Sequence, residues 1–170
     1  MKVGLISDTH GWLDPQVLTY FESCDEIWHA GDMGSLEVMQ QLEAYKPVRA
    51  VCGNIDGNEI RNKYPNNQLF ICEGLRIWIT HIAGNPPQYT PEILKTLQKD
   101  IPDILVCGHS HILRVMHDRQ HPPLLYINPG AAGRHGIHHV RTILRFDIQA
   151  AKITHMEAIE LGPRGSLKIT

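Results

Sequence analysis

The sequence contains no run of basic residues and no hydrophobic stretch long enough to cross a membrane. Of its 170 residues, 16 are Lys or Arg and 18 are Asp or Glu, which gives a net charge of −2. A broad nucleic-acid interface needs a basic surface, so we expect no nucleic-acid partner. The apolar run near the N-terminus ends at Ser7-Asp8. It is far shorter than the ~18 residues of a membrane span and too short for a signal peptide. We therefore expect a cytoplasmic protein that does not contact membranes.

Cysteine is also scarce. The four cysteines are Cys24, Cys52, Cys72 and Cys107. No two of them have CxxC spacing, which argues against a zinc knuckle. A length of 170 residues and a hydrophobic content of 42% suit a single domain, residues 1–170, with a sizeable core. Histidine, in contrast, is abundant, with 11 residues.

The first third of the chain alternates between predicted strands and predicted helices. Apolar runs predict strands at residues 2–7, 26–31 and 47–52. The helices between them cover residues 15–21 and 35–42, and Asp14 and Ser35 are their expected N-caps. This βαβαβ order predicts a parallel sheet with right-handed crossovers.

Beyond residue 52 the pattern changes to mostly strands. A polar segment rich in Gly and Asn predicts a loop over residues 53–67, and one further helix is expected from residue 90 to about residue 99. The later strands are predicted at 68–72, 75–81, 103–107, 112–117, 124–128, 139–148 and 152–160. We expect two packed sheets with helices outside them, and a single mixed sheet is the competing topology. The segment 162–170 is expected to be loosely held.

Polar side chains recur where the predicted strands end. The five motifs are Asp8-Thr9-His10, Gly31-Asp32, Gly53-Asn54, Thr80-His81 and Gly108-His109-Ser110-His111. In α/β sheets, ligands bind at this edge. Carboxylate oxygens and imidazole nitrogens without thiolates suit Mn²⁺, Fe, Zn²⁺ or Co²⁺ better than Ca²⁺ or Mg²⁺. Seven metal-competent side chains on one rim predict a site for two metal ions.

The seven side chains divide into two ligand sets that share one carboxylate. Asp32 would bridge both ions. Asp8, His10 and one late histidine would complete the first set, while Asn54, His81 and the other late histidine would complete the second. Two-metal hydrolases hold their ions about 3.5 Å apart. Two divalent ions, two aspartates and a bridging hydroxide leave a small positive charge, which favours a phosphate ester that the hydroxide attacks in line.

The motifs, in this order, resemble those of the calcineurin-like metallophosphoesterase superfamily. The short length and the segment Tyr126-Ile127-Asn128-Pro129-Gly130 resemble its small YfcE-type phosphodiesterases, and the resemblance covers residues 2 to about 160. It implies an α/β fold, a four-layer αββα sandwich of two mixed β-sheets flanked by helices. It also implies a metal-dependent phosphoric ester hydrolase with two divalent ions. We expect Mn²⁺, with Fe, Zn²⁺, Ni²⁺ or Co²⁺ as alternatives.

By the same resemblance, each metal ion has four protein ligands. The ligands of the first ion would be Asp8, His10, Asp32 and His111. The ligands of the second would be Asp32, Asn54, His81 and His109. Among them, we expect Asp32, Asn54 and His81 to take part in catalysis.

One position departs from the superfamily pattern. Many members have a histidine directly after the Gly-Asn pair, where it is thought to protonate the leaving group, but this chain has Ile55. Isoleucine cannot donate a proton, so protonation must come from elsewhere or be unnecessary. We therefore expect a phosphodiesterase that acts on small or exposed phosphate esters with good leaving groups. Residues 82–87 also replace the usual short continuation after His81, and we expect them to reshape the rim.

Two other functions remain open. A phosphomonoesterase is the first alternative, although Ile55 weakens it. A non-catalytic, protein-binding scaffold that resembles the retromer subunit Vps29 is the second. Assembly into a homo-oligomer is compatible with either.

Several polar residues near the motifs have two interpretations. Asp56 would either orient a ligand histidine or cap a turn. Asn54 and Arg134 are candidates for binding the substrate phosphate, and solvent exposure is the alternative for Arg134. The remaining nearby histidines are not expected to be ligands. His29 should point into the fold, and a surface turn should contain His135, His138 and His139.

Overall fold

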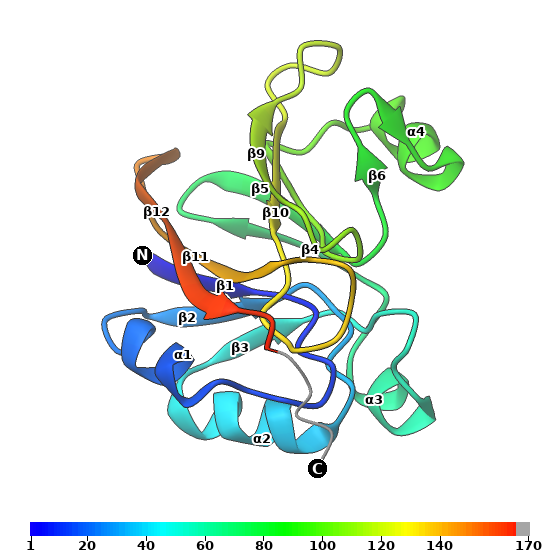
Figure 1. Ribbon diagram of the computed structural model, residues 1–170. Helices are drawn as coiled ribbons and strands as arrows, with labels where there is room; N and C mark the ends of the chain where they lie inside the picture. Colours follow the sequence, from blue (N-terminus) through cyan, green and yellow to red (C-terminus); the bar gives the residue numbers. More distant parts are fainter. Residues whose placement is uncertain (166–170) are drawn as a thin grey trace.

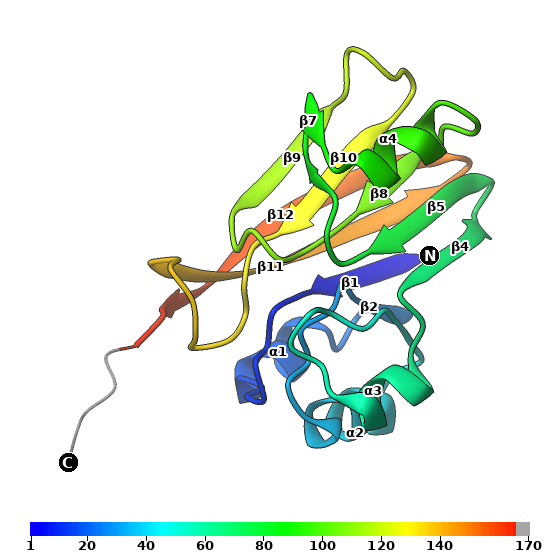
Figure 2. The same ribbon diagram turned by 90° about the vertical axis from the view of Figure 1, so that its right-hand side faces the viewer.

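The computed structural model describes residues 1–165 and shows two five-stranded mixed sheets packed face to face (Figures 1 and 2). Sheet A has the order β12-β11-β1-β2-β3, with β1 at Lys2–Ile6, β2 at Glu26–His29, β3 at Val48–Ala50, β11 at Val140–Gln149 and β12 at Lys152–Pro163. Sheet B has the order β4-β5-β8-β10-β9, with β4 at Asn67–Cys72, β5 at Leu75–Thr80, β8 at Ile104–Val106, β9 at Leu113–His117 and β10 at Leu125–Pro129. Both contain parallel and antiparallel pairs.

The central strand β1 shows how one sheet has two buried faces. Its side chains alternate, so that Val3 and Leu5 enter the core between the two sheets, while Ile6 enters the core beneath the helices. Gly4 also faces the helices, and a Cβ there would lie 2.6 Å from the ring of Phe21. The missing side chain therefore lets the helical layer pack closely on the sheet.

Helices cover the outer faces of both sheets. They are α1 at Pro15–Tyr20, α2 at Leu36–Tyr45, α3 at Asn58–Lys63 and α4 at Pro91–Leu97. The first three pack on sheet A, and α4 packs on sheet B against Trp78, Leu105 and Tyr126 (Figure 2). The three separate cores produce four layers. This confirms the αββα sandwich and excludes the single mixed sheet.

Of the two N-cap residues expected from the sequence, one makes the capping hydrogen bond and the other does not. Asp14 caps α1 as expected, because its side chain accepts a hydrogen bond from Gln16 N, at 3.0 Å. Ser35 occupies the N-cap position of α2, but its side chain makes no capping hydrogen bond.

Three segments differ from the expectations. The predicted loop 53–67 contains α3, which has one buried apolar residue, Ile60, and thus no detectable periodicity. A two-stranded hairpin, β6 at Gly84–Asn85 and β7 at Gln88–Tyr89, was not anticipated. The strand β12 continues to Pro163, so the expectation of a loose tail from residue 162 is wrong there. The rest of that expectation concerns residues 166–170, which lie outside the described residues.

None of the helices within residues 1–165 has the length and apolar character required to cross a membrane.

Candidate metal centre

Five of the seven predicted ligands have a left-handed backbone. The φ angles are 54° at Asp8, 49° at His10, 54° at Asp32, 66° at His109 and 58° at His111. Residues with side chains avoid this region, and such strain tends to accumulate where function demands a particular geometry. Here the sharp turns directly follow β1, β2 and β8. They direct the side chains from separate strand ends toward one place.

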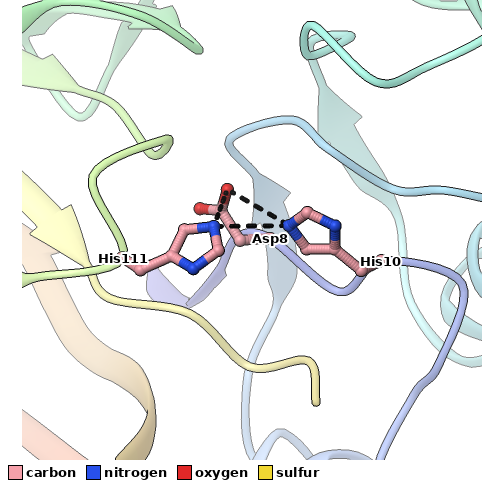
Figure 3. Close-up of side chains that lie close together, drawn as sticks. All are labelled: Asp8, His10 and His111. Carbon is pink, nitrogen blue, oxygen red and sulfur yellow. Dashed lines mark hydrogen bonds and ion pairs between the residues drawn. The ribbon is translucent and has the colours of Figure 1, made fainter. Parts of the chain in front are cut away.

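The first ligand group comprises Asp8, His10 and His111, which point toward one another (Figure 3). The Nε2 atom of His111 lies 3.2 Å from Asp8 Oδ1 and 3.3 Å from His10 Nε2. The distance from His10 Nε2 to Asp8 Oδ1 is 3.9 Å. Three potential ligand atoms from two distant parts of the chain therefore surround one point.

The second ligand group comprises Asp32, His81 and His109, with Asn54 beside them. The Nε2 atom of His81 lies 3.2 Å from Asp32 Oδ1 and 3.1 Å from Asn54 Oδ1. The other oxygen of Asp32 faces the first group, 3.8 Å from His10 Nε2. Asp32 thus lies between the two groups, in the position that the bridging hypothesis requires.

Two glycines allow the second group to close. A Cβ at Gly31 would lie 2.5 Å from His81 Nδ1, and one at Gly53 would overlap with the carboxylate of Asp32. The glycines of the Gly31-Asp32 and Gly53-Asn54 motifs are therefore needed for close approach. The His81 ring is oriented by a hydrogen bond between its Nδ1 atom and Ala30 O, at 2.8 Å.

The local electrostatics favour charged Asp32 and neutral imidazoles at two positions. Burial is the largest single influence on Asp32 and would raise its pKa. The hydrogen bonds from His81 and from the backbone N–H of Ile55, together with the charges of His81 and His10, outweigh burial and lower that pKa. Burial lowers the pKa of His10 and of His109. Burial is the largest single influence on His81 and opposes its protonation. The hydrogen bonds to Asp32 and Ala30 O, together with the charges of Asp8 and Asp32, outweigh burial and raise the pKa of His81 above the ordinary value. A neutral imidazole is the form that binds metal, so His10 and His109 are poised as ligands.

The donor set fits divalent cations. Asp8 is 0% exposed and Asp32 is 2% exposed, and no Lys or Arg within residues 1–165 forms an ion pair with either of them. A buried carboxylate without a cation is costly. Mixed carboxylate oxygens and imidazole nitrogens suit first-row transition ions.

Two buried polar residues hold the loops around the site. Asp56 accepts hydrogen bonds from the backbone N–H groups of Gly34, at 2.8 Å, and Gly53, at 2.7 Å. Of its two anticipated roles, the structure shows the turn-holding one. His29 is fully buried, as expected, and its ring contacts Thr9 Oγ1 at 3.0 Å and accepts a hydrogen bond from Gly31 N at 3.1 Å. Burial lowers its pKa to about 4.

The expectation that His138 lies on the surface is wrong. It is 8% exposed, and its Nδ1 atom lies 3.1 Å from His111 Nδ1. Its neighbours His135 and His139 are exposed, as expected. The sequence held no signal for this difference, because the loop has no periodicity and only its tertiary path decides which histidine turns inward.

The two remaining candidates lie at the rim. Arg134 is exposed, and its guanidinium stacks on the ring of Trp12 at 3.7 Å. Stacking uses the flat face of the guanidinium, while its donors lie in the plane. Ile55 is 47% exposed, and its backbone N–H donates to Asp32 Oδ1 at 3.1 Å. Ile55 therefore supports Asp32 through the backbone.

A polar pocket of about 260 Å³ adjoins the second ligand group. Its polar lining includes Asn54, Arg61, Asn66, Asn67, His81 and Glu92. Both α3 and the start of α4 contribute to its walls. The unanticipated helix α3 thus helps to form the space beside the site.

Comparisons with known proteins agree with this geometry. Residues 1–151 match the model of the calcineurin-like phosphoesterase superfamily domain. A probable metallophosphoesterase from Methanothermobacter thermautotrophicus is 31% identical over 139 residues, 77% of each chain. Another, from Methanocaldococcus jannaschii, is 29% identical over 137 residues, which are 77% of this chain and 68% of that protein.

Solved structures show the same fold at lower sequence identity. An archaeal phosphodiesterase has a TM-score of 0.74 and 23% identity, and the alignment covers 95% of this chain and all of that one. Wild-type Vps29 from Entamoeba histolytica, complexed with zinc, has a TM-score of 0.70 and 19% identity, with 97% and 100% coverage. The order of the motifs, the convergence of their side chains and the match over residues 1–151 lead to one conclusion: this chain belongs to the calcineurin-like phosphoesterase superfamily.

Proposed function

We propose that this protein is a phosphodiesterase that depends on two divalent metal ions, with Mn²⁺ as the expected native metal. The observation that carries the proposal is the position of Asp32 between two groups of ligands, with one carboxylate oxygen facing each group. The ligands of the first ion would be Asp8, His10, Asp32 and His111, and those of the second Asp32, Asn54, His81 and His109. Bound divalent ions supply Lewis-acid catalysis, which neutralises phosphate charge and makes hydroxide available at neutral pH.

The chain's own residues contribute binding and orientation. Asn54 is neutral, so its amide can donate to a phosphate oxygen without the repulsion that a carboxylate would cause. The backbone N–H of Ile55 and the imidazole of His81 hold Asp32 in place. Arg134, aligned by the Trp12 ring, is a second candidate for contacting the phosphate.

Two features favour a diester over a monoester. A diester has two alcohol groups, and the polar pocket beside Asn54 and His81 offers space for one of them. Ile55 supplies no proton, which suits substrates whose leaving group departs without an acid. The structural similarity to an archaeal phosphodiesterase agrees with this choice.

The test compares bis(4-nitrophenyl) phosphate with 4-nitrophenyl phosphate on Mn²⁺-loaded protein. We expect faster hydrolysis of the diester, loss of activity after chelation and recovery with Mn²⁺. Elemental analysis should give two ions per chain. The exposed residue His155 in β12 provides a matched control, because its partner is Asp147 and not a residue of the site, so His155→Ala should keep the metal content and rate. Saturation at one ion with full activity would contradict the two-metal proposal.

A protein-binding scaffold is the second candidate, and the similarity to Vps29 structures favours it. One of those structures contains zinc, so metal binding alone does not distinguish the two functions. Hydrolysis does. A scaffold would bind metal without turning over any phosphate ester in a broad panel.

A further inference from the structure

The loop between β10 and β11 folds back over the first ligand group. The backbone N–H of Gly133 donates to Asp8 O at 2.9 Å and fixes the start of the loop there. Gly136 has φ +124°, and a Cβ at this position would overlap with the imidazole of His111. Only glycine lets the loop approach so closely. This path brings His138 into contact with His111.

The hydrogen bonds of His138 define its tautomer. Its Nε2 atom lies 3.1 Å from Gly133 O, and a carbonyl oxygen can only accept, so Nε2 carries a proton. In the neutral ring, Nδ1 then has a lone pair. This lone pair faces His111 Nδ1 at 3.1 Å, so that atom must be the donor of the pair.

This hydrogen bond determines which nitrogen of His111 is free to bind metal. A neutral His111 with its proton on Nδ1 has an unprotonated Nε2, which faces Asp8 Oδ1 and His10 Nε2 at 3.2 and 3.3 Å. The ring of His81 in the second group is oriented in a similar way, because its Nδ1 atom is paired with Ala30 O while its Nε2 atom faces Asp32 and Asn54. Metal-binding histidines are usually oriented by such a partner on the other nitrogen.

We propose that His138 is a positioning residue that holds His111 in the tautomer whose Nε2 atom binds metal. The proposal rests on the proposed function, because it takes His111 as a ligand. His138 itself does not contact the metal or the substrate. It acts through two hydrogen bonds, one that His111 donates to His138 and one that His138 donates to Gly133 O.

The first experiment does not involve metal. Nitrogen-15 NMR of the imidazoles in metal-free wild-type protein reports which ring nitrogen carries the proton. We expect His111 to be protonated on Nδ1 and His138 on Nε2. A His111 ring protonated on Nε2 alone would overturn the proposal, and no variant has to fold for this result.

The second experiment uses three substitutions of His138 that differ in what they preserve. The Oδ1 atom of Asn can replace Nδ1 as the acceptor for His111, whereas the amide of Gln reaches Gly133 O and leaves no acceptor near His111. Leu removes both functions. Titration calorimetry with Mn²⁺ should therefore show a loss of about 10- to 100-fold in affinity for one ion in His138→Leu and His138→Gln. His138→Asn should stay within about threefold of wild type, on the same scale of effects.

The exposed neighbour His139 is the control, because His139→Leu changes the same loop without touching His111. Circular dichroism verifies folding of each variant. Equal affinities in the Asn, Gln and Leu variants would overturn the positioning role. Wild-type protein that binds no Mn²⁺ would instead overturn the proposed function, and the NMR tautomers would still report on the hydrogen-bond chain.

Discussion

The two ligand groups are held in different ways. In the second group, His81 directly follows β5, and its ring is anchored by Ala30 O at the end of β2. In the first group, His111 lies in the loop after β8, and its partner His138 belongs to the loop before β11. Sheet pairing therefore positions one half of the site, whereas closure of a loop positions the other. The shared residue Asp32 joins the two halves.

The largest expected effect comes from replacing Asp32, the residue shared by the two ligand groups. Asp32→Asn removes the charge that faces both groups, so we expect activity to fall on the order of a hundredfold or more and both ions to bind more weakly, since even indirect partners of a metal cost 10- to 100-fold. Asn54→Asp changes the second group alone and keeps an oxygen ligand, so the loss should be smaller. Kinetics and metal analysis of folded variants provide the measurement. Equal losses would show that Asp32 does not bridge.

A substitution of Ile55, beside the second ligand group, tests whether this part of the site protonates the leaving group. Without an acid at Ile55, the rate should depend strongly on the pKa of the leaving group, and a nitrophenyl diester should react far faster than an alkyl diester. Ile55→His should selectively help poor leaving groups, on the order of a hundredfold where the geometry allows. A series of diesters on both proteins measures the slope. If wild type shows no such dependence while chemistry is rate-limiting, another residue already serves as the acid.

Two alanine substitutions, at Gly31 and at Gly74, distinguish the effect of backbone strain from the effect of displacing His81. Gly31 and Gly74 both have positive φ, 98° and 86°, so replacement of either by Ala should cost roughly 1 kcal/mol or more of unfolding free energy. At Gly31 the new Cβ also strikes the His81 ring, whereas at Gly74 it meets only Ala151 at 3.4 Å. Gly31→Ala should therefore lose more stability and also metal affinity. Urea unfolding and Mn²⁺ titration distinguish the two, and unchanged affinity in Gly31→Ala would show that His81 adapts.

The last prediction concerns pH dependence alone and involves His29, which contacts the turns after β1 and β2. Its folded-state pKa is about 4, below the ordinary value of 6.5, so the unfolded chain binds more protons between these values. Its contribution therefore makes stability fall as pH drops from about 6.5 to 4, with a slope of at most roughly 1.4 kcal/mol per pH unit. His29→Gln should flatten the dependence of unfolding free energy on pH in metal-free protein. An unchanged slope would mean that His29 is protonated in the fold.

Much of the fold was predictable because its signals are local. Apolar runs bounded by polar motifs predicted β1, β2 and β8, and the N-cap residue Asp14 before Pro15 predicted the start of α1. The short helix α3 and the β6–β7 hairpin were not predicted. The helix has one buried residue and the hairpin has two residue pairs, and neither leaves a periodicity to detect. Their form depends on the surfaces against which they pack.

The candidate site divides in the same way. The sequence by itself determined which side chains are available, because Asp, His and Asn follow directly on strands whose ends must meet at one edge. Only the tertiary structure decided that Asp32 lies between both groups, that Asp56 holds loops and that His138, among three nearby histidines, turns inward. The physical reason is distance along the chain. His111 and His138 are 27 residues apart, and packing of the two sheets, together with a glycine at position 136, brings them together.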